Sequence, residues 1–338
     1  LTGTHILDRM RMTGRDVDDT KIAVTDAILA DLLAFDLPYP DQSLAGDHKK
    51  FLGFRIVVVI PPGDAGSGAG DEYLAEGRRF DELGIEKGIL LPLIGPEEYL
   101  PQSNQEILEI CRRYPDRFLP FCNIDPRGIA NSPFTDFRPW LDWYREHGCL
   151  GVGEFMPNLS FRDPLVLNFF RQVDAMSWPL TFDVTVWIGR GYGLVDEPGL
   201  PHLEFCLKSF PKMKILGHGP AFWSEMGVLE TVGDRGGYPT YPIHEEGAVP
   251  KLFRRYSNLW GDLSAGSGYN ALARDPDHAV RFLNEFQDRL CFGTDLCTAD
   301  GALPLAPFLL DLKNKGRISE TVFQKIAREN AVGLLHLA

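Results

Sequence analysis

Polar residues that suit acid–base chemistry stand at the ends of three short apolar segments. Segment 289–295 ends on Asp295, segment 212–218 ends on His218, and Leu180-Thr-Phe-Asp ends on Asp183. A buried strand that stops on a polar residue is typical of the catalytic end of a parallel barrel, although a strand-end aspartate also caps a following loop or helix. Such ends meet only if their strands are neighbours with the same direction. The sequence therefore predicts a site built on parallel strands.

Two more acids fit the same arrangement. Glu154 stands near the end of segment 149–155, and Asp262 near the end of segment 258–263. Each has an ordinary structural alternative, because Glu154 can pair with a polar group of the next strand and Asp262 precedes a Ser/Gly stretch that we read as a loop. Carboxylates with an imidazole either bind zinc or manganese, or act without metal as acid and base, since repulsion between carboxylates raises a pKa.

Aromatic and basic residues fall in the segments that follow the same strands. The predicted substrate-binding residues are Trp187, Arg190, Phe222, Trp223 and Tyr269. Aromatic walls favour a small organic substrate over a phosphorylated one, and Arg190 offers a charge for a substrate carboxylate. Arg235 offers a second positive charge for a substrate carboxylate. The alternative for both Arg190 and Arg235 is an ordinary surface charge. Segment 233–246 has the length of a mobile lid, and its His244 is within reach of the site.

The elements that position these residues form a regular alternation from residue 54 onward. The predicted strands are 54–60, 87–93, 118–123, 149–155, 179–184, 212–218, 258–263 and 289–295. The predicted helices are 72–83, 104–114, 137–147, 165–176, 202–210, 249–256, 278–286, 303–314 and 319–335. Eight near-continuous apolar strands that alternate with helices favour an α/β fold, a closed (β/α)8 TIM barrel. Residues 1–52 lack this alternation, so we expect an N-terminal extension before a barrel domain at 53–338.

Charge and hydropathy narrow the range of partners. A formal net charge of -13 argues against nucleic acid and anionic membranes. No apolar run reaches the roughly 20 residues of a membrane span, and no signal pattern opens the sequence, so we expect a cytoplasmic protein. The six cysteines have no paired or zinc-binding spacing and predict reduced, buried thiols.

Several of these segments together resemble the amidohydrolase superfamily, and most closely its amidohydrolase-2 branch. They are 103–118, 120–127 (Pro-Phe-Cys-Asn-Ile-Asp-Pro-Arg), 153–159 (Gly-Glu-Phe-Met-Pro-Asn-Leu), 217–223 (Gly-His-Gly-Pro-Ala-Phe-Trp), 262–270 (Asp-Leu-Ser-Ala-Gly-Ser-Gly-Tyr-Asn) and 292–295 (Phe-Gly-Thr-Asp). The branch also contains decarboxylases related to aminocarboxymuconate semialdehyde decarboxylase. The resemblance covers about residue 54 to the end of the chain.

The resemblance implies a metal site with missing ligands. Family members usually bind one divalent metal through a His-x-His pair on the first strand, a His on the fifth and an Asp on the eighth, and often use a sixth-strand His in catalysis. Asp295 and His218 match the last two, but Val59 and Pro61 stand where the His-x-His pair falls and Asp183 replaces the fifth-strand His. The segment Thr4-His5-Ile6-Leu7 resembles the family's Thr-His-x-His start, although the spacing of the strands favours 54–60 as the first.

These matches give a predicted site and reaction. The predicted metal ligands, for zinc or manganese, are Glu154, Asp183, His218 and Asp295, and the predicted catalytic residues are His218 and Asp295. The resemblance implies hydrolysis of a C–N or lactone C–O bond in a small, carboxylated cyclic metabolite. Asp295 is then the base or a metal ligand, and His218 the proton donor or the polarising group.

Two alternatives remain open at this point. One is a decarboxylase or related lyase, in which His218 protonates carbon. The other is a barrel without catalysis that binds a ligand or assembles subunits. Because family members are commonly dimers, we also expect a homodimer, with the N-terminal extension as an interface element.

Overall fold

Eight parallel strands form a closed ring in the computed structural model, which describes residues 51–56, 80, 83–98, 101–296 and 303–337. In chain order they are β1 (Phe51–Ile56), β2 (Ile85–Leu90), β3 (Phe118–Pro120), β4 (Val152–Phe155), β5 (Pro179–Thr185), β7 (Lys214–His218), β8 (Leu259–Asp262), and β9 (Leu290–Cys291) continued by β10 (Gly293–Leu296). A parallel bridge between Cys122 and Val152 joins β3 to β4, and β10 pairs with β1. The ring is a TIM barrel, as predicted.

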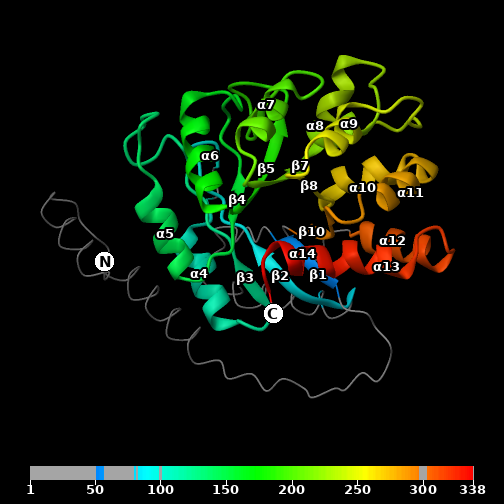
Figure 1. Cartoon of the computed structure of the whole chain (residues 1–338), viewed down its shortest axis with the longest axis horizontal. Coiled ribbons are helices and arrows are strands. Elements are labelled where there is room, and N and C mark those ends of the chain that lie inside the picture. The colour runs from blue at the N-terminus through cyan, green and yellow to red at the C-terminus, as the bar shows by residue number, and fades with distance from the viewer. Residues whose placement is uncertain (1–50, 57–79, 81–82, 99–100, 297–302, 338) are drawn as a thin grey trace, which may run out of the picture. The chain divides into compact units, whose positions relative to one another are not determined.

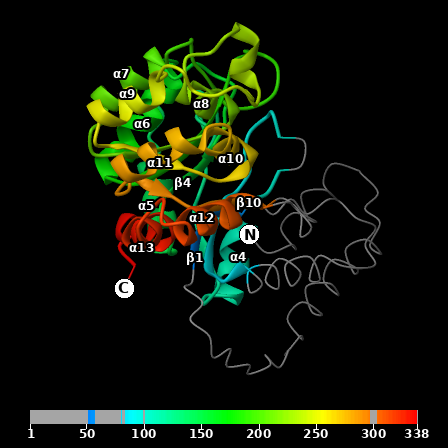
Figure 2. The ribbon, with the colours of Figure 1, turned by 90° about the vertical axis from the view of Figure 1, so that its right-hand side faces the viewer.

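Helices surround the strands in chain order, as the colours in Figure 1 show. They are α4 (Asn104–Arg113), α5 (Arg138–Glu146), α6 (Pro164–Met176), α7 (Pro201–Ser209), α8 (Pro220–Trp223), α9 (Ala248–Arg255), α10 (Ala265–Ala273), α11 (Pro276–Glu285), α12 (Leu305–Asn314), α13 (Glu320–Gln324) and α14 (Asn330–Leu334). The 3-10 helices η1 (Ser224–Met226) and η2 (Val232–Gly236) follow α8, and the π-helix η3 (Lys325–Glu329) joins α13 to α14. Helices α10 to α13 face the viewer in Figure 2.

The predicted strands and helices are confirmed with small changes of boundary, except that nearly all of helix 72–83 and residues 57–60 of the first strand lie outside the described residues. Strand β1 begins at Phe51, three residues before the predicted 54–60, and pairs with β2 and β10. The predicted extension at 1–52 lies outside the described residues apart from the first two residues of β1. No helix in the described part of the chain has the length and apolarity of a membrane span.

The Ser/Gly stretch after Asp262 is helix α10 and not the loop that we expected. Ser264 precedes the helix in an extended conformation that suits an N-cap. Gly268 is required by packing: a Cβ there would lie 2.3 Å from the carbonyl oxygen of Leu263. A helix that starts this close to the end of β8 requires a residue without a side chain there.

The barrel interior has an apolar part and a polar part. Ile89, Phe121, Leu216 and Cys291 fill the apolar part and pack against Ala331, Leu334 and Leu335 of the C-terminal segment. Each fully buried aliphatic or aromatic side chain contributes about 1.5–3 kcal/mol of transfer free energy. The C-terminal helices thus close the barrel opposite the polar strand ends.

The C-terminal helices are also bonded to the eighth strand. That strand is interrupted at Phe292, whose backbone N–H donates to the carbonyl oxygen of Ile326 in η3 at 2.9 Å. The side chain of Asn330 donates to the carbonyl oxygen of Leu290 at 2.7 Å. These bonds fix the strand that leads to Asp295.

The described cysteines are all buried free thiols, as predicted. Burial raises the pKa of Cys111 and Cys206 far above its usual range. Such thiols are inert packing groups.

Candidate active site

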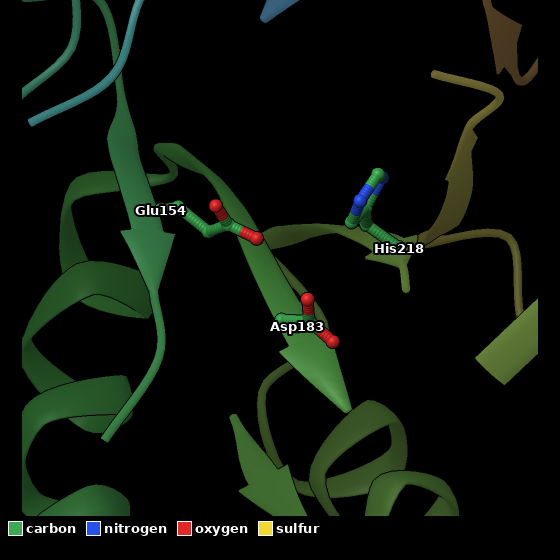
Figure 3. A group of neighbouring side chains, drawn as sticks. All are labelled: Glu154, Asp183 and His218. Atoms are coloured by element: carbon green, nitrogen blue, oxygen red, sulfur yellow. The ribbon is translucent and has the colours of Figure 1, made fainter. Parts of the chain in front are cut away.

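Glu154, Asp183 and His218 come together at the C-terminal ends of three successive strands of the ring. Their ligand atoms all lie within 4.8 Å of one another, and all three residues are buried. Figure 3 shows the Glu154 carboxylate reaching from β4 toward Asp183 of β5, with His218 of β7 on the far side. The structure therefore brings together three of the four predicted metal ligands.

Strand alternation turns these residues inward. On β5, Leu180 and Phe182 belong to the core cluster outside the ring, so Thr181 and Asp183 face the interior. Asp183 and His218 are direct partners in the β5–β7 register. Gly219 follows His218 with a φ of +89°, and a Cβ there would lie 2.1 Å from Asp183 Oδ1. The Gly-His-Gly sequence thus leaves room for the carboxylate.

Asp262 and Ser264 orient the imidazole of His218. The Nδ1 atom lies 3.2 Å from Ser264 Oγ and 3.5 Å from Asp262 Oδ2. Asp262 Oδ1 also accepts from the backbone N–H of Ser264 at 3.0 Å. With Nδ1 occupied on this side, Nε2 is the ring atom available to the site. Sequence reasoning missed Ser264, although the spacing Asp-x-Ser after a strand carries the signal.

Asp295 stands beside His218 and is partly exposed. Its side chain is 18 % exposed, and its Oδ2 lies 4.0 Å from His218 Nε2. That separation exceeds a hydrogen bond and allows one water to contact both atoms. Asp295 is not in the group whose ligand atoms converge, so its geometry suits a base next to the cluster better than a fourth ligand.

The three converging residues fit a divalent cation. Two carboxylates and one imidazole match the donors that zinc and manganese accept. Donors around a tetrahedral zinc at about 2.0–2.2 Å lie about 3.3–3.6 Å apart, so ligand atoms within 4.8 Å of one another need to approach by on the order of 1 Å. Asn123 supports the cluster by donating from Nδ2 to the carbonyl oxygen of Glu154 at 2.5 Å. The positions of Val59, Pro61 and His5 lie outside the described residues.

We expect protein purified without chelator or added metal to contain about one zinc or manganese per chain by elemental analysis. Replacing Asp183 with alanine should remove most of it, because a third of the donor set is lost. Asp295→Asn is the matched control and should keep the metal. Loss of metal from Asp295→Asn, or a metal-free wild type after incubation with either ion, would contradict this assignment.

Two residues near the site were not anticipated from the sequence. Burial raises the pKa of Glu98, which follows β2, and the charges of Glu97 and Asp183 add to the rise. Burial also raises the pKa of Tyr238, with contributions from Asp295 and Asp183. The charges of the acids in the site therefore affect both residues. Both lie on loops, and the periodicity of the strands does not predict the path of a loop.

The predicted substrate-binding residues fall into two groups. Trp187 is 58 % exposed, and the guanidinium of Arg190 lies 5.9 Å from the centre of its ring. Phe222 and Trp223 are fully buried, so the expected substrate contact has no exposed surface there. The turn of α8 carries them to the outer side of the ring, where Phe222 packs on Gly217. Tyr269 is half-buried against Phe308.

The segment 233–246 and its polar residues also differ from expectation. Arg235 is buried and paired with Glu225, so it is not the carboxylate-binding residue that we considered. The start of the segment is η2, and Asn270 donates to the carbonyl oxygen of Pro239 at 3.1 Å. These contacts anchor the segment on both sides of Tyr238. His244 is exposed.

Comparison with known proteins agrees with the fold. An uncharacterized TIM-barrel protein from Bordetella bronchiseptica is 16 % identical with a TM-score of 0.53 over 85 % of this chain and 99 % of its own. A 2,6-dihydroxybenzoate decarboxylase from Rhizobium is 17 % identical with a TM-score of 0.52 over 86 % and 99 %. A probable 2-pyrone-4,6-dicarboxylic acid hydrolase from Acinetobacter baumannii is 15 % identical with a TM-score of 0.51 over 85 % and 99 %.

The family assignment comes from sequence comparison. A search of curated protein sequences finds no match. The family model for amidohydrolases of the amidohydrolase-2 type matches residues 98–337, which is more than half of the chain. Its members are enzymes, hydrolases and decarboxylases among them. The chain therefore belongs to the amidohydrolase family.

Proposed function

We propose that this chain is a hydrolase that cleaves a C–N or lactone C–O bond of a small, carboxylated cyclic metabolite. The observation that carries the proposal is the pair formed by Asp295 and His218 beside the cluster, with 4.0 Å between Oδ2 and Nε2. A carboxylate and an imidazole at this separation leave room for a water that contacts both, and a positioned base of this kind is what hydrolysis requires.

Each residue has a role in the reaction. Asp295 accepts a proton from the water as the water oxygen bonds to the carbonyl carbon, and His218 polarises the carbonyl. The C–N or C–O bond then breaks, and the leaving atom takes the proton back from Asp295. Asp262 and Ser264 keep the imidazole aligned throughout. A divalent cation held by Glu154, Asp183 and Nε2 of His218 would polarise the carbonyl in place of the imidazole.

The reaction is tested by product analysis on a panel of cyclic carboxylic acids. The panel includes 2-pyrone-4,6-dicarboxylate, after which the Acinetobacter protein is named. It also includes 2,6-dihydroxybenzoate, after which the Rhizobium protein is named. Mass spectrometry should find a ring-opened acid that has gained one water. An Asp295→Asn preparation, purified in parallel, controls for contaminating activity. Release of carbon dioxide without ring opening would instead establish the decarboxylase alternative.

A further inference from the structure

A short loop, residues 186–193, presents exposed aromatic and apolar side chains directly after the strand that carries Asp183. The loop leaves β5 and returns as β6 (Leu194–Val195), which pairs with Val184 and Thr185 of β5. Its tip exposes Trp187, Ile188 and Tyr192. The pairing of β5 with β6 holds the two ends of the loop together, and an exposed apolar tip held in this way suits a ligand-binding surface.

Asn158, which follows β4, fixes the conformation of this tip. Its buried side chain donates from Nδ2 to the carbonyl oxygen of Trp187 at 2.8 Å and accepts from the backbone N–H of Gly189 at 2.5 Å. The N–H of Gly193 donates to the carbonyl oxygen of Met156 at 2.9 Å. Gly189 and Gly193 both have positive φ, so the loop depends on glycine to reach these partners.

Asn158 is itself tied to the loops that follow β2 and β3. Its backbone N–H donates to Glu97 Oε1 at 3.3 Å, and Arg127 holds both oxygens of Glu97 at 2.6 and 2.7 Å. Arg127 also pairs with Asp125 at 2.5 Å. Burial alone would raise the pKa of Glu97, but Arg127 outweighs it and lowers the pKa, so Glu97 remains an acceptor. The tip is thus braced by three other strand-end loops.

We propose that Asn158 is a positioning residue that holds Trp187 and Arg190 as a recognition surface for a planar ring bearing a carboxylate. The indole provides a face for the ring, and Arg190, within cation–π distance of that indole, provides the charge. Because the loop is held before the ligand arrives, little ordering entropy is lost on binding. The inference rests on the proposed function for the identity of the ring as substrate.

Trypsin cleavage after Arg190, mapped by mass spectrometry on the native full chain, tests the positioning without any turnover. Asn158→Ala and the milder Asn158→Asp should be cut about tenfold faster than wild type at this bond, because lost hydrogen bonds favour the open loop. Asn284→Ala, which removes a surface asparagine on α11 that bonds its own helix, is the control and should be cut at the wild-type rate. Thermal melting shows whether each variant is folded. Unchanged cleavage in folded Asn158 variants would overturn the positioning role.

Phthalate, a planar ring with two carboxylates, is the probe for recognition. It should protect Arg190 from trypsin in wild type and fail to protect it in Trp187→Ala. No protection of the wild type, with faster cleavage of the Asn158 variants, would overturn the recognition role. With the substrate identified by product analysis, Asn158→Ala should raise KM while kcat stays within about threefold. Failure of hydrolysis leaves the trypsin results intact, so the two proposals fail separately.

Discussion

Asp295→Asn is expected to lower kcat by about two to four orders of magnitude, the usual contribution of a positioned general base. The asparagine has the same shape as aspartate, but its amide cannot accept the proton that the attacking water must lose. KM should change little, because the proposed ring and carboxylate contacts lie on residues 186–193. Steady-state kinetics on the substrate identified by product analysis gives both constants.

The control for this substitution is Asp277→Asn on α11. Asp277 is exposed and pairs with Arg317 at 2.5 Å, so its replacement changes charge equally without touching the site. That variant should retain wild-type kcat. If Asp295→Asn kept more than about a tenth of wild-type kcat, Asp295 would not be the base.

Arg235→Met is expected to destabilise the fold by about 3–5 kcal/mol, the usual cost of leaving a buried charge without its partner. Arg235 and Glu225 are only 2 % and 5 % exposed and form an ion pair. Arg235 also donates to the carbonyl oxygen of Asp196 at 2.6 Å, and Glu225 accepts from the N–H of Gly199 at 2.7 Å. Removing the arginine leaves the buried carboxylate of Glu225 without its ion-pair partner. Urea unfolding followed by circular dichroism measures the loss.

The loss should depend on pH in a defined direction. Burial raises the pKa of Glu225, and the charge of Arg235 opposes that rise. Without Arg235 the folded-state pKa moves further above the unfolded value. The folded state then binds a proton that the unfolded state releases, so the penalty grows as pH rises from the unfolded pKa toward the folded one. Arg235→Met should therefore lose less stability at pH 5 than at pH 8.

Two variants separate the charge effect from general damage. Arg190→Met removes an exposed arginine and should leave the unfolding midpoint nearly unchanged. Arg235→Met combined with Glu225→Gln should recover part of the lost stability, because no buried charge remains. A double variant no more stable than the single one would show that packing, and not charge, is what Arg235 provides.

The strand ends could be predicted from sequence because the inward direction repeats every second residue. Asp183 stands two residues after Thr181 on β5, and His218 stands two residues after Leu216 on β7, so each points to the same side of its strand as that neighbour. Once a strand is correctly located in the sequence, the direction of its last side chain follows. The closed ring follows from eight such strands. Periodicity is a local signal, and these features depend on it alone.

Arg235 and Trp223 show where local signals fail. Arg235 stands in a Gly-rich segment typical of a surface loop, but Glu225, ten residues earlier, neutralises it inside the fold. Trp223 follows Gly-Pro at a strand end, yet a single helical turn carries its indole outward to donate to the carbonyl oxygen of Asp262 at 2.9 Å. Both outcomes depend on how a loop folds back onto the barrel, which residue type and spacing do not specify.

The bond between Phe292 and Ile326 has a consequence for synthesis on the ribosome. Strand β1 is synthesised before β10, with which it pairs. The residue that precedes β10, Phe292, is in turn hydrogen-bonded to η3, which is synthesised later still. Until η3 has left the exit tunnel, the nascent barrel exposes the unpaired edge of β1 and Asp295 has no fixed position. Such an edge is an aggregation hazard during translation. Closure of the ring and completion of the site therefore both wait for the synthesis of η3.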